Sequence, residues 1–93
     1  MSSTLFVITQ SGLESVPIDS DQRVFAEETI VDGETMYPIY AEDAFSYGRN
    51  EDLHFLGEYS NEITAMRIIE EITQARASRK NYYKMPMTKH MRL

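Results

Sequence analysis

Few side chains in this 93-residue sequence are of a type and spacing that carry chemistry. The two histidines, His54 in an apolar stretch and His90 near the end, form no metal-binding spacing such as H-E-x-x-H with the carboxylates. A lone strand histidine is more often a hydrogen-bonded core or surface residue than a ligand or a base. The four glycines are too scattered for a phosphate-binding loop, and no nucleophile motif is present. We therefore expect a protein that is not an enzyme and that holds no cofactor and no metal.

One acidic region is the best remaining place for a cation. Residues 41–52 form a polar stretch in which the pairs 42–43 and 51–52 are both acidic. Two such pairs could form a weak divalent site, but their spacing matches no EF-hand, and a solvated loop is the simpler interpretation. The start of this stretch, 41–45, could instead form one helical turn.

Charge is strongly segregated along the chain. Residues 1–63 contain 13 acidic residues and two arginines, whereas residues 64–93 contain seven cations and two glutamates, so a net charge of −11 is followed by one of +5. This layout could steer a partner or join two copies head to tail, or it could simply keep the protein in solution. The basic end includes Tyr82 and Tyr83, a combination that can bind nucleic acid, but the acidic remainder would repel phosphates. An acidic surface can also imitate nucleic acid and occupy a basic groove. Nucleic acid is therefore not an expected partner.

Length and composition indicate a single small domain in a reducing compartment. Ninety-three residues suffice for one modest core, which dimerisation would extend. The absence of cysteine excludes disulfides and thiolate metal sites. The first residues lack a signal peptide's positive region, and no apolar run is long enough to span a membrane. We expect a cytoplasmic location.

Strand-forming residues and turn signals dominate the first two-thirds of the sequence. Pro17 indicates a strand that is short or at an edge, and Pro38 indicates an edge strand, because proline cannot donate to a ladder. Asp32-Gly33 is a strong hairpin signal, and Gly57 marks a bulge or the close approach of another element. The run Leu53–Tyr59 has apolar residues on both faces, which suggests a central strand. The five β-prone runs are Thr4–Thr9, Leu13–Ile18, Arg23–Val31, Glu34–Tyr40 and Leu53–Tyr59.

One amphipathic helix is predicted at about residues 60–78. Ser60 is a suitable N-cap, and Glu62 places negative charge in the first turn. An apolar stripe then recurs at helical spacing, and charged residues occupy the opposite face. We therefore expect an α+β fold in which this helix packs on one face of an antiparallel sheet of about five strands. The stripe consists of Ala65, Ile68, Ile69 and Ile72.

Several apolar residues lie outside that stripe. Ile63 lies on the polar side of the helix, and the others belong to an extended basic tail, 81–93, that follows a domain of residues 1–80. The tail could fold back onto its own sheet or contact a second copy. Because aromatic residues and methionine are enriched in interface cores, we expect these residues to contact another protein. The candidate interface residues are Ile63, Tyr82, Tyr83, Met85 and Met87.

Both ends of the sequence resemble a family of short uncharacterised proteins from Gram-positive bacteria and their phages. The resemblance rests on the LGEYS element at 56–60 with the helix that follows, on residues 8–12, and on the aromatic–Met–Pro segment 82–87. Residues 19–52 match nothing in that family, and Ile63 replaces a usually polar residue. The resemblance implies a small sheet covered by one helix and a phage or prophage origin. The family has no assigned activity, so it assigns no role to any residue.

These observations together predict a non-enzymatic protein–protein interaction protein of phage or prophage origin. We expect its partner to be a second copy of itself, in a homodimer, or a host protein. The alternative is an acidic inhibitor of a host nucleic-acid-binding protein, since the first two-thirds of the chain are so acidic.

Overall fold

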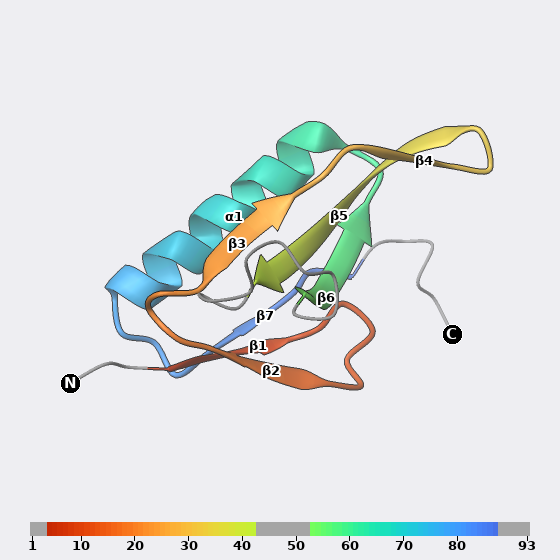
Figure 1. Cartoon of the computed structure of the whole chain (residues 1–93). Coiled ribbons are helices and arrows are strands. Elements are labelled where there is room, and N and C mark those ends of the chain that lie inside the picture. The colour runs from red at the N-terminus through yellow and green to blue at the C-terminus, as the bar shows by residue number, and fades with distance from the viewer. Residues whose placement is uncertain (1–3, 43–52, 88–93) are drawn as a thin grey trace.

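The computed structural model describes residues 4–42 and 53–87 (Figure 1). These residues form one helix and seven short strands, and the predicted α+β class is confirmed. The helix, α1 (Glu62–Ala77), falls within the predicted range. The strands are β1 (Leu5–Ile8), β2 (Ser15–Ile18), β3 (Arg23–Ala26), β4 (Thr29–Val31), β5 (Glu34–Glu42), β6 (Leu53–Tyr59) and β7 (Tyr82–Lys84).

The strands form two sheets, where a single antiparallel sheet of about five strands was predicted. In the first sheet, β1 lies between β2, which is antiparallel to it, and β7, which is parallel. In the second, β5 pairs with β6 on one side and with β3, followed by β4, on the other. Two features account for the two strands beyond the predicted five. Glu27 and Glu28 divide the predicted run 23–31 into two strands, and the segment after α1 adds β7 to β1.

Pro38 lies in the central strand of its sheet, and the edge position predicted from it is wrong. Its carbonyl accepts a hydrogen bond from the Glu27 N–H at 3.1 Å. The N–H and C=O of one strand residue point to the same neighbour, so the proline ring removes a single ladder bond, at the junction between β3 and β4. The expectation for Pro17 is confirmed, because β2 pairs with β1 alone in the described sheets.

The Asp32-Gly33 hairpin is confirmed. Val31 faces Glu34 across the β4–β5 ladder, which leaves two residues in the loop. Both have positive φ, 51° at Asp32 and 82° at Gly33. Two consecutive left-handed residues define the type I′ turn, which matches the twist of the paired strands.

Gln10 joins the two sheets at the side of β6 that faces away from β5. β6 pairs with a single strand in the described structure. It is therefore not the central strand that its two apolar faces suggested. Its other side is held by Gln10, whose N–H donates to the Leu56 carbonyl at 2.9 Å and whose Oε1 accepts from the Glu58 N–H at 2.8 Å. A Cβ on Gly57 would lie 3.0 Å from Gln10 Cβ. Gly57 thus permits this close approach, and a register shift interrupts the ladder opposite it, as the sequence predicted.

The helix N-cap is Asn61 and not the predicted Ser60. The Asn61 side-chain Oδ1 accepts hydrogen bonds from the N–H groups of Ile63 at 2.8 Å and Thr64 at 3.2 Å. The Asn61 backbone is extended, as an N-cap requires. The cap therefore lies one residue later than predicted, because an asparagine at this position satisfies two of the otherwise unpaired N–H groups of the first turn.

Removing this cap should weaken the helix. Asn61→Ala is expected to lower the free energy of unfolding by about 1 kcal/mol, because two N–H groups lose their acceptor. Ser60→Ala, one residue earlier, should change it by less than about 0.5 kcal/mol. Urea unfolding of both variants measures the difference, and equal losses would contradict the assignment.

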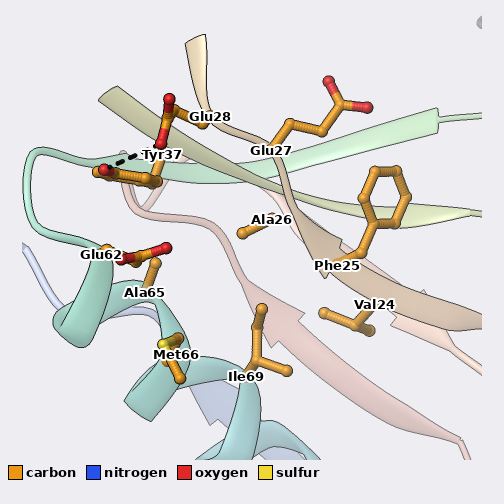
Figure 2. A pocket seen from close by; sticks show the side chains of 10 residues that line it. All are labelled: Val24, Phe25, Ala26, Glu27, Glu28, Tyr37, Glu62, Ala65, Met66 and Ile69. Carbon is orange, nitrogen blue, oxygen red and sulfur yellow. Dashed lines mark hydrogen bonds between the residues drawn. The ribbon is translucent and has the colours of Figure 1, made fainter. Parts of the chain in front are cut away.

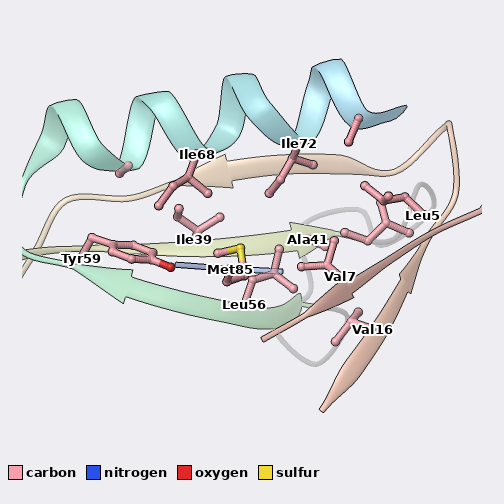
Figure 3. Packing of buried hydrophobic residues seen from close by; sticks show 13 residues of the cluster. Leu5, Val7, Val16, Ile39, Ala41, Leu56, Tyr59, Ile68, Ile72 and Met85 are labelled. Carbon is pink, nitrogen blue, oxygen red and sulfur yellow. The ribbon is translucent and has the colours of Figure 1, made fainter. Parts of the chain in front are cut away.

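The core lies between α1 and the two sheets (Figure 3). Ala65, Ile68 and Ile72 of the predicted stripe are buried, and Ile69 is half-buried at its margin. The segment after α1 contributes Met85, which is 1% exposed. Within the described residues, no helix is both long and apolar enough to span a lipid bilayer. Other buried residues from the strands are Leu5, Val7, Val16, Ile18, Ile39, Ala41, Leu56 and Tyr59.

Candidate protein-binding groove

A groove of about 340 Å³ runs between β3 and α1 (Figure 2). Strand β3 forms one wall and helix α1 the other, so an edge strand and a helix face each other across it. The lining is largely apolar, with carboxylates near the helix N-terminus. It consists of Val24, Phe25, Ala26, Glu27, Glu28, Tyr37, Glu62, Ala65, Met66 and Ile69.

Strand β3 presents an open edge to this groove. The Glu27 N–H bonds to Pro38 of β5, and backbone groups of alternate strand residues point to the same side. Phe25 therefore also faces β5, whereas the backbone groups of Val24 and Ala26 point away from it. No other strand of the described sheets pairs with β3. Two N–H and two C=O groups are thus available to an added strand.

Arg76 closes this edge near the C-terminal end of α1. Its Nη2 donates to the carbonyl of Asp19 at 2.7 Å and to that of Gln22 at 2.8 Å. Gln22 directly precedes β3, and its carbonyl already accepts a hydrogen bond from the Arg76 side chain. The open part of the edge is limited to Val24 and Ala26, with a cation at the end where β3 begins.

The opposite end of the groove is acidic. The Tyr37 hydroxyl donates to Glu28 Oε1 at 3.5 Å, and Glu62 of the first helical turn lies close by (Figure 2). Partial burial and the negative charges of Glu28 and Glu62 raise the pKa of Tyr37. The carboxylates of Glu28 and Glu62 make this end of the groove negative, so it favours a cation.

The helix wall is apolar and partly uncovered. Ala65 is buried, Ile69 is half-buried, and Met66 has 62% of its surface exposed. Methionine adapts its shape readily to different partners. Ile63, one turn earlier, is 68% exposed and extends this apolar surface beyond the groove.

The tail residues predicted to form an interface occupy different environments. Met85 is buried in the core of its own chain. Tyr83 is half-buried, and its hydroxyl donates to Glu71 Oε1 at 2.6 Å. Burial and this carboxylate raise the pKa of Tyr83. Tyr82 and Met87 are exposed, at 62% and 53%.

The structure separates Tyr82 from the other exposed members of that set. Tyr82 begins β7 just beyond the C-terminal end of α1. Met87 lies toward the other end, because the neighbouring Pro86 carbonyl accepts a hydrogen bond from the Tyr59 hydroxyl at 2.8 Å. Ile63 also lies at that end, where α1 begins. The five residues therefore do not form one continuous surface.

An aromatic row crosses the other face of the second sheet. The ring centroids of Phe25 and Tyr40 are 5.7 Å apart, and those of Tyr40 and Phe55 are 5.9 Å apart. The Arg23 guanidinium lies 4.4 Å from the Phe25 centroid and forms an ion pair of 3.1 Å with Glu42. These contacts tie β3, β5 and β6 together on this face.

The described residues offer no site for a metal ion. No three His, Asp or Glu side chains within residues 4–42 and 53–87 gather closely enough to bind one. Of the acidic stretch considered above, Glu42 pairs with Arg23 and residues 43–52 lie outside the described part. His54 is exposed on β6, and His90 lies outside the described residues.

The groove was not predicted from the sequence. Its edge depends on which strand lies outermost, and neither glycine nor proline marks β3 as an edge. Comparison with protein-family models, with curated proteins and with solved structures gives no match to this chain. The α+β class is therefore the assignment that the fold supports, and the function must be argued from the surfaces themselves.

Proposed function

We propose that this protein acts by non-enzymatic protein–protein interaction, and that its contact site is the groove between β3 and α1. The observation that supports this is the pairing of an open strand edge with an apolar wall. A partner segment in extended conformation would add to β3 and place alternate side chains against α1. The main chain then supplies affinity, and the groove supplies selectivity.

Contact area and hydrogen bonding both favour such a partner. Val24 and Ala26 offer backbone donors and acceptors that need no rearrangement. Met66 and Ile69 offer apolar surface that water now contacts. Burial of about 100 Å² of that surface would stabilise a complex by about 2–3 kcal/mol. The interaction is therefore of the transient class.

Selection from a random library of 12-residue peptides displayed on a carrier tests this proposal. We expect enrichment of peptides with alternating apolar residues, which then bind the purified protein in titration calorimetry. The proposal would be contradicted if no peptide were enriched, or if substitutions in the groove left the binding of every enriched peptide unchanged.

A proline in the open edge should block strand addition. Ala26→Pro removes an outward N–H that β5 does not use, so the fold is retained while binding of a selected peptide weakens at least about tenfold. Ala26→Ser keeps that N–H and should bind as the wild type does. Thermal unfolding of both variants checks that the fold is unchanged. Equal binding by both would show that the β3 edge is not used.

Self-association belongs to the same proposal. A homodimer is the form we propose in solution, with the exposed Ile63, Tyr82 and Met87 as further contact residues. A cytoplasmic location and a phage or prophage origin complete the proposal, and the origin is supported by the sequence resemblance alone. Sedimentation velocity over a wide concentration range tests the dimer, which a monomer at the highest concentration would exclude.

The second candidate function is inhibition of a host nucleic-acid-binding protein. The acidic end of the groove, formed by Glu28 and Glu62, favours it, because basic nucleic-acid grooves attract carboxylates. Competition distinguishes the two functions. If the protein is such an inhibitor, added nucleic acid would displace it from its partner. If the partner binds along β3, added nucleic acid would leave the complex intact.

A further inference from the structure

We propose that the segment docking on β3 is an extended basic peptide, antiparallel to β3, with its lysines or arginines on the N-terminal side of its strand-forming residues. This inference rests on the proposed function and specifies the partner's chemistry. It is carried by the charges at the two ends of the open edge.

The charges define a direction along the groove. Glu28 and Glu62 lie where β3 ends, beside the Tyr37 hydroxyl. Arg76 lies where β3 begins, with its guanidinium held by the carbonyls of Asp19 and Gln22. A partner with cations beside Glu28 and Glu62 matches the charge of that end, while the Arg76 guanidinium at the other end is already held by two carbonyls.

The strand direction then fixes the order of the partner's residues. In antiparallel pairing, the N-terminal side of the added strand lies beside the C-terminal end of β3. That is the end with Glu28 and Glu62. Antiparallel pairs are slightly more stable per residue than parallel ones and outnumber them, and β3 already pairs with β5 in this way. The basic residues of the partner should therefore precede its alternating residues.

The length of the open edge limits the strand-forming part of the partner. Val24 and Ala26 are the two β3 residues whose backbone groups face outward, and Arg76 occupies the Gln22 carbonyl before them. About four or five extended residues suffice to pair with this edge. Every second one of them turns toward Met66 and Ile69 and should be apolar.

Three peptides of nine residues test the inference by fluorescence anisotropy. The first has three lysines followed by alternating valine and threonine, the second has the same two blocks in reverse order, and the third has glutamines in place of the lysines. All are acetylated and amidated, so that their termini are neutral. We expect the lysine-first peptide to bind about five- to tenfold more tightly than the other two.

Two double variants with equal charge loss locate the effect. Glu28→Gln with Glu62→Gln should abolish the preference for the lysine-first peptide and reduce the salt dependence of its binding. Glu34→Gln with Glu70→Gln removes two exposed carboxylates that do not line the groove, and it should keep both. Equal effects of the two double variants would overturn the inference, because the preference would then reflect net charge.

The outcomes separate this inference from the proposed function. Equal binding of all three peptides, weakened in Ala26→Pro, would overturn the inference and leave strand addition intact. Equal binding of the two lysine peptides would overturn the antiparallel orientation and with it the inference. Absence of binding by every peptide, or binding insensitive to Ala26→Pro, would contradict the proposed function itself. Self-association abolished by both Ala26→Pro and the groove double variant would support the inference and identify the basic segment as part of a second copy.

Discussion

Met85→Ala is expected to lower the free energy of unfolding by about 2–5 kcal/mol. Met85 is 1% exposed and packs in the same core as the helix stripe, although it follows the helix by eight residues. Truncating it leaves a cavity that the sheets on either side cannot fill. Chemical denaturation followed by circular dichroism measures the loss.

Met87 provides the matched control. It lies two residues further on and is 53% exposed, so Met87→Ala should change stability by no more than about 0.5 kcal/mol. Met85→Leu conserves volume and should cost less than about 1.5 kcal/mol, which keeps the test usable if the alanine variant is unfolded. A loss at Met85 that disappears at high protein concentration would place this residue in an interface and contradict the assignment to the core.

Alkaline pH should destabilise the protein through Tyr59. Burial raises the pKa of Tyr59 from 10.0 to about 12, and 1% of this residue is exposed. Below pH 10 both folded and unfolded states keep the proton, so the full stability is present. Above pH 10 the unfolded chain loses its proton first, and stability falls until the folded state also titrates. The loss reaches about 2–3 kcal/mol, and the raised pKa of Tyr83 acts in the same direction.

Tyr59→Phe separates this effect from general alkaline unfolding. At neutral pH the variant loses the hydrogen bond to the Pro86 carbonyl, which costs about 1 kcal/mol. Above pH 10 its stability should fall less steeply than that of the wild type. Tyr82→Phe removes the hydroxyl of a tyrosine that is 62% exposed and serves as the matched control. Parallel profiles for wild type and Tyr59→Phe would exclude Tyr59 as the titrating group.

Local signals predicted the local structure well. The helix, its buried stripe and the Asp32-Gly33 turn follow from periodicity and backbone preference, which act over a few residues. Pro38 shows where such reasoning fails. Proline indicates a position where the sheet needs no N–H donor. Such a position occurs at the edge of a sheet, but also where one neighbouring strand ends and the next begins, as opposite Pro38.

Features that join distant segments were beyond the sequence signals. Gln10 directly follows the first β-prone run, Thr4–Thr9, and its side chain binds the backbone of β6, 48 residues later. The groove depends in the same way on which strand is outermost and on where α1 packs. Such arrangements arise from the global balance of burial, which residue types alone do not record.

The parallel pairing of β1 with β7 bears on how the chain folds. Phe6 faces Tyr82, which is 76 positions later in the sequence. The chain between them must therefore form a closed loop before these strands meet. Closing a loop of that length costs conformational entropy, and this cost is not offset until the contacts at its ends have formed. Contacts of this separation slow folding, as the inverse relation between rate and contact order describes. The first sheet is therefore expected to be completed late, when the segment that follows the helix adds β7 to β1.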